Sequence, residues 1–184
     1  MEKIIISDNE DKLIPVLWTG DESVLAYDIV LAGVNARVKF LALLIGRGED
    51  KVDMKVKVTH EGKDTKSEVI IKSVLYDKAS ISFDGLISIQ PGAKGTQAWL
   101  AAHMLLLSPK ARGTAIPNLE ILENDIKAGH ATTVGRVSNM ELFYLMSRGL
   151  SEETAKGLIV EGFLQSIIEM FPESLAKRTK QQLA

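Results

Sequence analysis

The sequence predicts a mainly β fold, built as a solenoid and followed by a small α-helical subdomain at the C-terminus. Three observations lead to this prediction. Residues 52–58 alternate strictly between apolar and polar side chains, a short turn-like pattern recurs three times, and the hydrophobic period becomes helical after Gly135. We therefore expect a β core over residues 1–137 and a helical subdomain over residues 138–184.

The strand predictions depend on short apolar runs. The alternation of residues 52–58 places four apolar side chains on one face, and residues 67–72 and 79–83 are further runs between Asp, Gly and Pro. An apolar residue, then Asp or Pro, then Ala recurs at offsets of 14 and 18 residues, in Leu75-x-Asp77-x-Ala79, Ile89-x-Pro91-x-Ala93 and Leu107-x-Pro109-x-Ala111. These offsets suit one coil of a solenoid with Ala packed at the corner. The alternative is a chance recurrence of turn residues in another all-β domain.

Two helices are expected after the β core. Ser138 forms a capping box with Glu141 at the start of the first helix, and Gly149 closes it in the left-handed conformation. The second helix begins after Ser151 and ends near Pro172.

The second helix carries more apolar surface than one contact needs. Besides its inner stripe it has a second ridge, made of Val160, Leu164, Ile168 and Phe171. Two interpretations remain open. Other helices of the same chain, including residues 173–184, cover both apolar faces, or a docking partner covers one of them.

Composition excludes several classes of protein. The 184 residues are 46% hydrophobic and carry a formal net charge of −2 without long single-sign blocks, so neither a nucleic-acid surface nor a membrane surface is indicated. No run reaches the roughly 18 apolar residues of a membrane-spanning helix, and residues 1–8 do not resemble a signal peptide. We expect a cytoplasmic protein. Cysteine is absent, which excludes thiolate ligands and cysteine nucleophiles from this chain.

The candidate chemistry is limited. Residues 46–51 lack the spacing of a phosphate-binding loop, so no nucleotide is expected on this chain, and no serine has a nucleophile-elbow motif. His130 follows Glu120 and Asp125 by ten residues or fewer, so one solenoid turn can bring carboxylate and imidazole together as ligands for iron or zinc. The alternative for each histidine is a hydrogen-bonded structural role, and we assign His60 and His103 to that role. The chemistry alone indicates a non-enzymatic scaffold.

Several motifs in combination resemble a known family. They are residues 117–121 (PNLEI), residues 125–135 (DIKAGHATTVG), residues 142–150 (LFYLMSRGL) and Gly162-Phe163, with Thr59-His60-Glu61 and Phe83-Asp84-Gly85 upstream. Together they resemble the C-terminal core of the SufB/SufD proteins of the SUF iron–sulfur assembly system. The resemblance covers roughly residues 56–172.

The resemblance implies a right-handed parallel β-helix with a helical C-terminal subdomain. It also implies pairing through the β-helix with a SufB/SufD-like subunit or with a second copy, and binding of the SufC ATPase by the helices. His130 is then a candidate ligand near the subunit interface for iron or a transient iron–sulfur cluster, with no tightly bound cofactor. The expected partner-binding residues are Phe143, Tyr144, Arg148, Val160, Leu164, Ile168 and Phe171.

This chain departs from the family pattern around the histidine. Its neighbours are Gly129 and Ala131, and Ala128 stands where SufD-like proteins often have cysteine. The first hypothesis is a scaffold subunit for iron–sulfur cluster assembly, with sulfur arriving as sulfide or on a partner's cysteine. The second is a structural module that only organises the ATPase. A third is a solenoid enzyme such as a carbohydrate lyase or esterase, which the helical ending and the family-like motifs disfavour.

Overall fold

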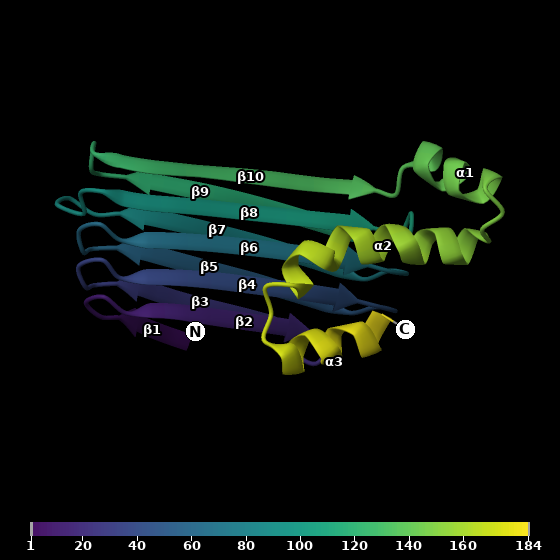
Figure 1. Cartoon of the computed structure of the whole chain (residues 1–184), viewed down its shortest axis with the longest axis horizontal. Helices are drawn as coiled ribbons and strands as arrows, with labels where there is room; N and C mark the ends of the chain where they lie inside the picture. Colours follow the sequence, from purple (N-terminus) through teal and green to yellow (C-terminus); the bar gives the residue numbers. More distant parts are fainter. Residues whose placement is uncertain (1, 184) are drawn as a thin grey trace.

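The protein folds into ten β-strands followed by three α-helices, as described for residues 2–183 by a computed structural model (Figure 1). One parallel sheet, sheet A, contains β1 (Glu2–Ile6), β3 (Val24–Leu31), β5 (Lys51–His60), β7 (Ser80–Ile89) and β9 (Arg112–Ile121), in that order. The other parallel sheet, sheet B, contains β2 (Asp11–Trp18), β4 (Arg37–Gly46), β6 (Lys66–Leu75), β8 (Thr96–Leu106) and β10 (Ile126–Arg136). The helices are α1 (Asn139–Ser147), α2 (Glu152–Ile168) and α3 (Glu173–Leu183).

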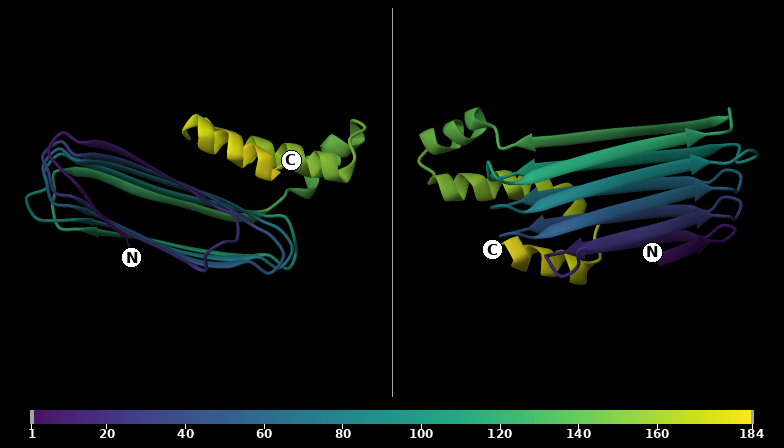
Figure 2. Two further views of the ribbon diagram at one scale, coloured as in Figure 1. Left: turned by 90° about the horizontal axis from the view of Figure 1, so that it is seen from below. Right: turned by 180° about the vertical axis from the view of Figure 1, so that it is seen from behind.

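Successive strands alternate between the two sheets, so one odd and one even strand make a coil of a flattened solenoid (Figure 2). The predicted fold class, a parallel β-solenoid followed by helices, is confirmed. The predicted coil length is corrected. Residues 51, 80 and 112 occupy equivalent positions in successive coils, so one coil takes 29 and then 32 residues. The offsets of 14 and 18 residues therefore measure half a coil, which is one strand and one corner.

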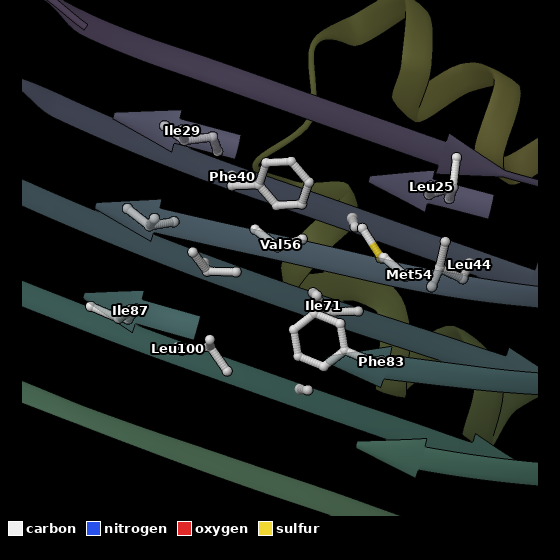
Figure 3. Close-up of a cluster of buried hydrophobic side chains, with 14 of the residues drawn as sticks. Leu25, Ile29, Phe40, Leu44, Met54, Val56, Ile71, Phe83, Ile87 and Leu100 are labelled. Carbon is white, nitrogen blue, oxygen red and sulfur yellow. The ribbon is translucent and has the colours of Figure 1, made fainter. Parts of the chain in front are cut away.

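The space between the sheets is filled by alternate side chains of both sheets (Figure 3). The alternating strand predicted over residues 52–58 lies within β5, and its apolar set is buried, as predicted. The recurring alanines also pack as predicted, because Ala79, Ala93 and Ala111 are buried where the chain turns from one sheet to the other. The ring of Phe83 occupies space that a side chain at residue 85 would need, because a Cβ added to Gly85 would lie 2.6 Å from the ring.

The corners that lead into sheet B carry a feature that the sequence analysis missed. One residue in each of four successive corners has a positive φ, and its N–H donates a hydrogen bond to a carbonyl of the next coil. These residues are Asn9, Asn35, Asp64 and Gly95. Asn, Asp and Gly are the residues that tolerate this left-handed conformation best. The last of these bonds, from Gly95 to the carbonyl of Asp125, is 2.8 Å long and fixes the turn immediately before β10.

A second hydrophobic cluster joins the helices to the outer face of sheet B. Helix α2 lies across the C-terminal ends of the even strands, and α3 lies beside it (Figures 1 and 2). The buried members of this cluster are Leu41, Leu43, Ile45, Val74, Val160, Leu164, Ile167, Ile168 and Phe171. Sheet B is therefore apolar on both faces in this half, because it packs on the solenoid core and on α2.

One polar group in the core has no partner. The Oγ of Ser73 is buried and forms no hydrogen bond within residues 2–183. An unpaired buried hydroxyl costs about 1–3 kcal/mol in desolvation. We expect Ser73→Ala to raise the free energy of unfolding in urea by about 1 kcal/mol, because it removes this cost at little loss of volume. The matched control is Ser67→Ala, which should lower stability because the Ser67 Oγ forms a 2.8 Å hydrogen bond with Nε2 of His60. Lower stability in Ser73→Ala would contradict the prediction.

Candidate functional site

The solenoid has an open end at its last coil. β10 pairs only with β8, and β9 pairs only with β7, so within residues 2–183 the other edge of each strand has no partner. Large apolar side chains are exposed on this coil and the turn that joins its two strands, namely Ile116, Ile121, Leu122 and Val134. An unpaired parallel edge with exposed apolar side chains is a surface on which another chain can be added.

His130 lies in the middle of β10, at this open end. It stands opposite Leu100 of β8 in the parallel register, and Leu100 is fully buried in the solenoid core. The His130 side chain therefore belongs to the set that faces the space between the sheets, with Ala128 and Thr132 beside it on the same face. It is nevertheless exposed, because no further coil lies above it within the described chain.

The structure does not bring the two acidic residues predicted to accompany His130 together with it in a three-ligand site within residues 2–183. Leu119 packs against the core, so the next residue, Glu120, faces outward from sheet A, and its Oε2 accepts a 2.6 Å hydrogen bond from Ser88 Oγ. Asp125 lies in the turn before β10, where its carbonyl accepts the Gly95 N–H. Within residues 2–183 no three His, Asp or Glu side chains lie close enough together to hold a metal ion. His130 alone does not make a metal site.

Gly129 has a packing role on the opposite face of the same strand. It stands opposite Trp99 in the register, and a Cβ at residue 129 would lie 2.5 Å from the Trp99 ring. The indole therefore needs glycine at this position. The small residue before His130 is explained by the neighbouring strand, which sequence reasoning could not identify.

His103 links β8 to its neighbour β10 within sheet B, and Lys72 links α2 to the outer face of this sheet. The Nδ1 of His103 forms a 2.8 Å hydrogen bond with Thr133 Oγ1 of β10. The Nζ of Lys72 donates to the carbonyl of Phe163 and, at 2.8 Å, to Ser166 Oγ, and it lies 4.8 Å from the centre of the Phe163 ring. Burial lowers the pKa of Lys72, and burial followed by the charge of Lys72 lowers the pKa of His103.

His60 is a core histidine, as assigned from the sequence. Its ring is fully buried and forms 2.8 Å hydrogen bonds with Thr65 Oγ1 through Nδ1 and with Ser67 Oγ through Nε2. Thr65 Oγ1 is also 2.9 Å from Thr96 Oγ1, so the polar network continues into the next coil. Burial lowers the pKa of His60 to about 4, so the ring is neutral at pH 7.

Helix α1 presents apolar side chains to solvent. Ser138 caps it by accepting a 3.3 Å hydrogen bond from the Glu141 N–H, and Gly149 follows it with φ +94°, both as predicted. No residue of α1 is buried, and the exposed fraction of Phe143 is 73%. Tyr144 is also exposed, with the guanidinium of Arg148 5.3 Å from its ring centre. We call the exposed apolar residues of α1 the α1 patch: Met140, Phe143, Tyr144 and Met146.

The second apolar ridge of α2 is not a docking surface in this structure. Its four residues, Val160, Leu164, Ile168 and Phe171, are buried in the cluster that joins α2 to sheet B. In this structure the chain itself covers these four side chains, so they are not exposed to a partner. The covering surface combines the outer face of β4 and β6 with α3, since Leu175, Ala176 and Leu183 of α3 pack against the same cluster.

Three features of the site were missed from the sequence. Trp99, Lys72 and the two methionines of the α1 patch drew no functional assignment. The positions of Trp99 and Lys72 depend on contacts with Gly129 and Phe163 on other elements, and the methionines are exposed. Lys72 is the one with a detectable signal, since it lies between two apolar residues, Ile70 and Val74, in the outward row of β6.

The fold is a parallel β-solenoid with an exposed edge and an appended helical segment. The comparisons with known proteins show which family of β-solenoids it belongs to. The family model described as "SUF system FeS cluster assembly, SufBD core domain" matches residues 10–163. The chain belongs to this SufB/SufD core-domain family, as the motifs indicated.

Named relatives support the assignment. The chain is 40% identical over 130 residues to the iron–sulfur cluster assembly protein SufD of Bacillus subtilis, covering 71% of this chain and 30% of that protein. It is 36% identical over 152 residues to a SufBD family protein of Methanothermobacter thermautotrophicus, covering 82% and 36%. It is 32% identical over 158 residues to one of Mycobacterium bovis, covering 85% and 19%. The chain therefore spans about a third or less of the length of these relatives. Within residues 2–183, the helices are too short or too polar to cross a membrane.

Proposed function

We propose that this protein is a non-enzymatic scaffold subunit of SUF-type iron–sulfur cluster assembly, and that it pairs through the open end of its β-helix. The partner is a SufB/SufD-like subunit or a second copy of the chain. The observation that carries the proposal is the last coil, where two unpaired strand edges and exposed apolar side chains surround a single imidazole. Pairing there would bury this surface and continue the sheets across the interface.

His130 would supply one nitrogen ligand to iron or to a nascent cluster at that interface. The cluster is the cargo of the complex, and this chain offers it no cysteine. Because residues 2–183 hold no cluster of three ligating side chains, the remaining ligands and the sulfur must come from the partner or from free sulfide. The lack of a self-contained site is what a shared interfacial site requires.

The α1 patch is the surface we assign to a SufC-type ATPase. Its aromatic residues are exposed on a helix fixed at both ends by a Ser138 cap and by Gly149, so a partner can bind them without first ordering the helix. Helix α1 leads into α2, and Lys72 attaches α2 to sheet B. A displacement of the helices by the ATPase would therefore act on the sheet to which β10 belongs.

A second candidate function is a structural module that docks the ATPase and leaves cluster chemistry to another chain. The absence of cysteine favours it. The two functions differ in one respect only, which is whether His130 ligates iron. A single comparison of variants therefore separates them.

We expect His130→Ala to lose most of the cluster formed by anaerobic reconstitution with ferrous iron and sulfide, in the presence of the ATPase and ATP. Thr132→Ala is the matched control, because Thr132 lies on the same face of β10 two residues away. Visible absorption and Mössbauer spectra measure the cluster. Equal cluster content in both variants and the wild type would remove the ligand role. No cluster in any of them, with the ATPase still bound, would favour the structural module.

A double variant tests the ATPase surface. We expect Phe143→Ala with Tyr144→Ala to weaken ATPase binding at least about tenfold, since exposed aromatic residues often dominate interface energies. Isothermal titration calorimetry measures the affinity. Because both side chains are exposed, the midpoint of thermal unfolding should stay within about 2 °C of the wild type. Unchanged affinity in the folded double variant would show that the ATPase binds elsewhere.

A further inference from the structure

The outer face of sheet B carries a hollow that neither the proposed interface nor the helices use. It has a volume of about 340 Å³ and lies at the N-terminal ends of β6, β8 and β10. Helix α2 crosses the other half of the even strands, so this half of the face is bare (Figure 1). The hollow is lined by the side chains of Lys66, Glu68, Gln97, Trp99 and Lys127, and Gly129 also lines it.

Trp99 gives the hollow an aromatic wall. It is 46% exposed, whereas the other tryptophan, Trp18, is 2% exposed and donates its indole N–H to the carbonyl of Glu22. The Trp99 ring lies so close to Gly129 that no side chain would fit there. The ring is thus seated against the neighbouring strand while part of its surface stays open to solvent. An exposed indole that is already held in place can stack on a planar ring of a ligand while losing little conformational entropy.

Three donors line the hollow in one row. Lys66, Gln97 and Lys127 are register partners on successive strands of sheet B. Parallel strands lie about 4.8 Å apart, so the two lysines are about 10 Å apart at the backbone and their long side chains can converge on one anion above Gln97.

The nearest carboxylate in the hollow does not compete for these lysines. Glu68 forms a 2.9 Å ion pair with Lys39 on its other side. Neither Lys66 nor Lys127 forms an ion pair with any described residue. Arg37 precedes Lys66 in the same row and adds a third cation, with Asp11 beyond it at the end of the row. The row is therefore net positive on a chain whose overall charge is −2.

We propose that this hollow binds a small planar anion, an aromatic ring that carries a carboxylate or a phosphate group. The ring stacks on the indole of Trp99, and the anionic group lies between Lys66 and Lys127 with the Gln97 amide as a further donor. His130 and Gly129 are adjacent on β10 but face opposite sides of the sheet, so this site is separate from the open end and does not depend on the proposed function.

The test is a fluorescence titration with phenyl phosphate and, in a parallel arm, benzoate. Because Trp18 is buried and Trp99 is exposed, quenching by these ligands reports on Trp99. We expect saturable quenching by at least one of them, with an affinity at least about tenfold above that of benzyl alcohol or inorganic phosphate, because ring and anion contribute together. The two arms distinguish phosphate from carboxylate recognition.

Two double variants complete the test. Lys66→Gln with Lys127→Gln should weaken binding about tenfold or more. Lys55→Gln with Lys57→Gln, exposed on the outer face of sheet A, should leave it unchanged and controls for net charge. Circular dichroism melting confirms that both variants fold. The proposal is overturned by non-saturable quenching, by equal affinity for the separate fragments, or by equal losses in the two double variants. The proposal would also be overturned if phenyl phosphate and benzoate compete for one site but the Lys66→Gln, Lys127→Gln variant binds them as tightly as the wild type.

Discussion

Replacing Leu164 by alanine is expected to lower the free energy of unfolding by about 3.5 kcal/mol, the middle of the range for a fully buried leucine. Leu164 is 0% exposed and lies in the cluster where α2 meets Leu41 and Leu43 of β4. The substitution would remove its apolar contacts and leave a cavity between a helix and a sheet that cannot fully close. Urea unfolding followed by circular dichroism measures the change.

Leu158→Ala is the matched control for this experiment. Leu158 lies on the same helix but is 46% exposed, so its truncation should change stability by no more than about 0.5 kcal/mol. If the two variants lose equal stability, the packing of α2 on sheet B is wrong and the ridge is free to dock a partner. If only Leu164→Ala is destabilised, weak ATPase binding by that variant reports on folding rather than on docking.

Acid is expected to destabilise the protein through His60. Burial lowers the pKa of His60 to about 4 in the folded state, whereas an unfolded histidine has a pKa of about 6.5. Above pH 6.5 the ring is neutral in both states, so its contribution to stability is complete. Between pH 6.5 and pH 4 the unfolded state takes up the proton first, and about 3 kcal/mol of stability is lost. Below pH 4 both states are protonated and the loss levels off.

The comparison with His60→Gln isolates this contribution. Glutamine can donate and accept hydrogen bonds towards Thr65 and Ser67 but does not titrate between pH 4 and pH 7. The variant should be less stable than the wild type at pH 7, and the difference should shrink as the pH falls to 4. Urea unfolding at several pH values measures both curves. A difference that stays constant with pH would show that His60 does not carry the acid sensitivity.

Residues of the candidate site were predictable where a local signal existed. The histidine of residues 125–135 could be singled out because a specific motif surrounds it, and the structure places it on an exposed strand at the open end. The caps of α1 were predictable because Ser138 and Gly149 act within a few residues of their own position. The orientation of Glu120 was not predictable in the same way, since the alternation of β9 turns it to the outside of sheet A whereas His130 belongs to the inward-facing set of β10.

Other features could not be predicted because they depend on residues far apart in the sequence. Residue 129 must be glycine because of the ring of Trp99, thirty residues earlier. Lys72 has a role only because its Nζ donates a hydrogen bond to the carbonyl of Phe163 on α2. The left-handed conformation at each corner of the solenoid belongs to a single residue, and no sequence motif surrounds that residue. Each is fixed by a hydrogen bond to the next coil, as with the Asn35 N–H and the carbonyl of Lys63 at 2.8 Å.

The sequence by itself determined the class of fold, the helical ending and the family, because strand alternation, helix caps and short motifs depend only on residues that are close together in the sequence. The tertiary structure alone decided the length of a coil, the outward orientation of Glu120 on β9, and what covers the apolar ridge of α2. The physical reason is that a solenoid brings equivalent residues together at a spacing of about 30 positions. Contacts at that separation come from the stacking of coils, so Leu164 is a core residue and His130 a surface residue only once the coils are in place.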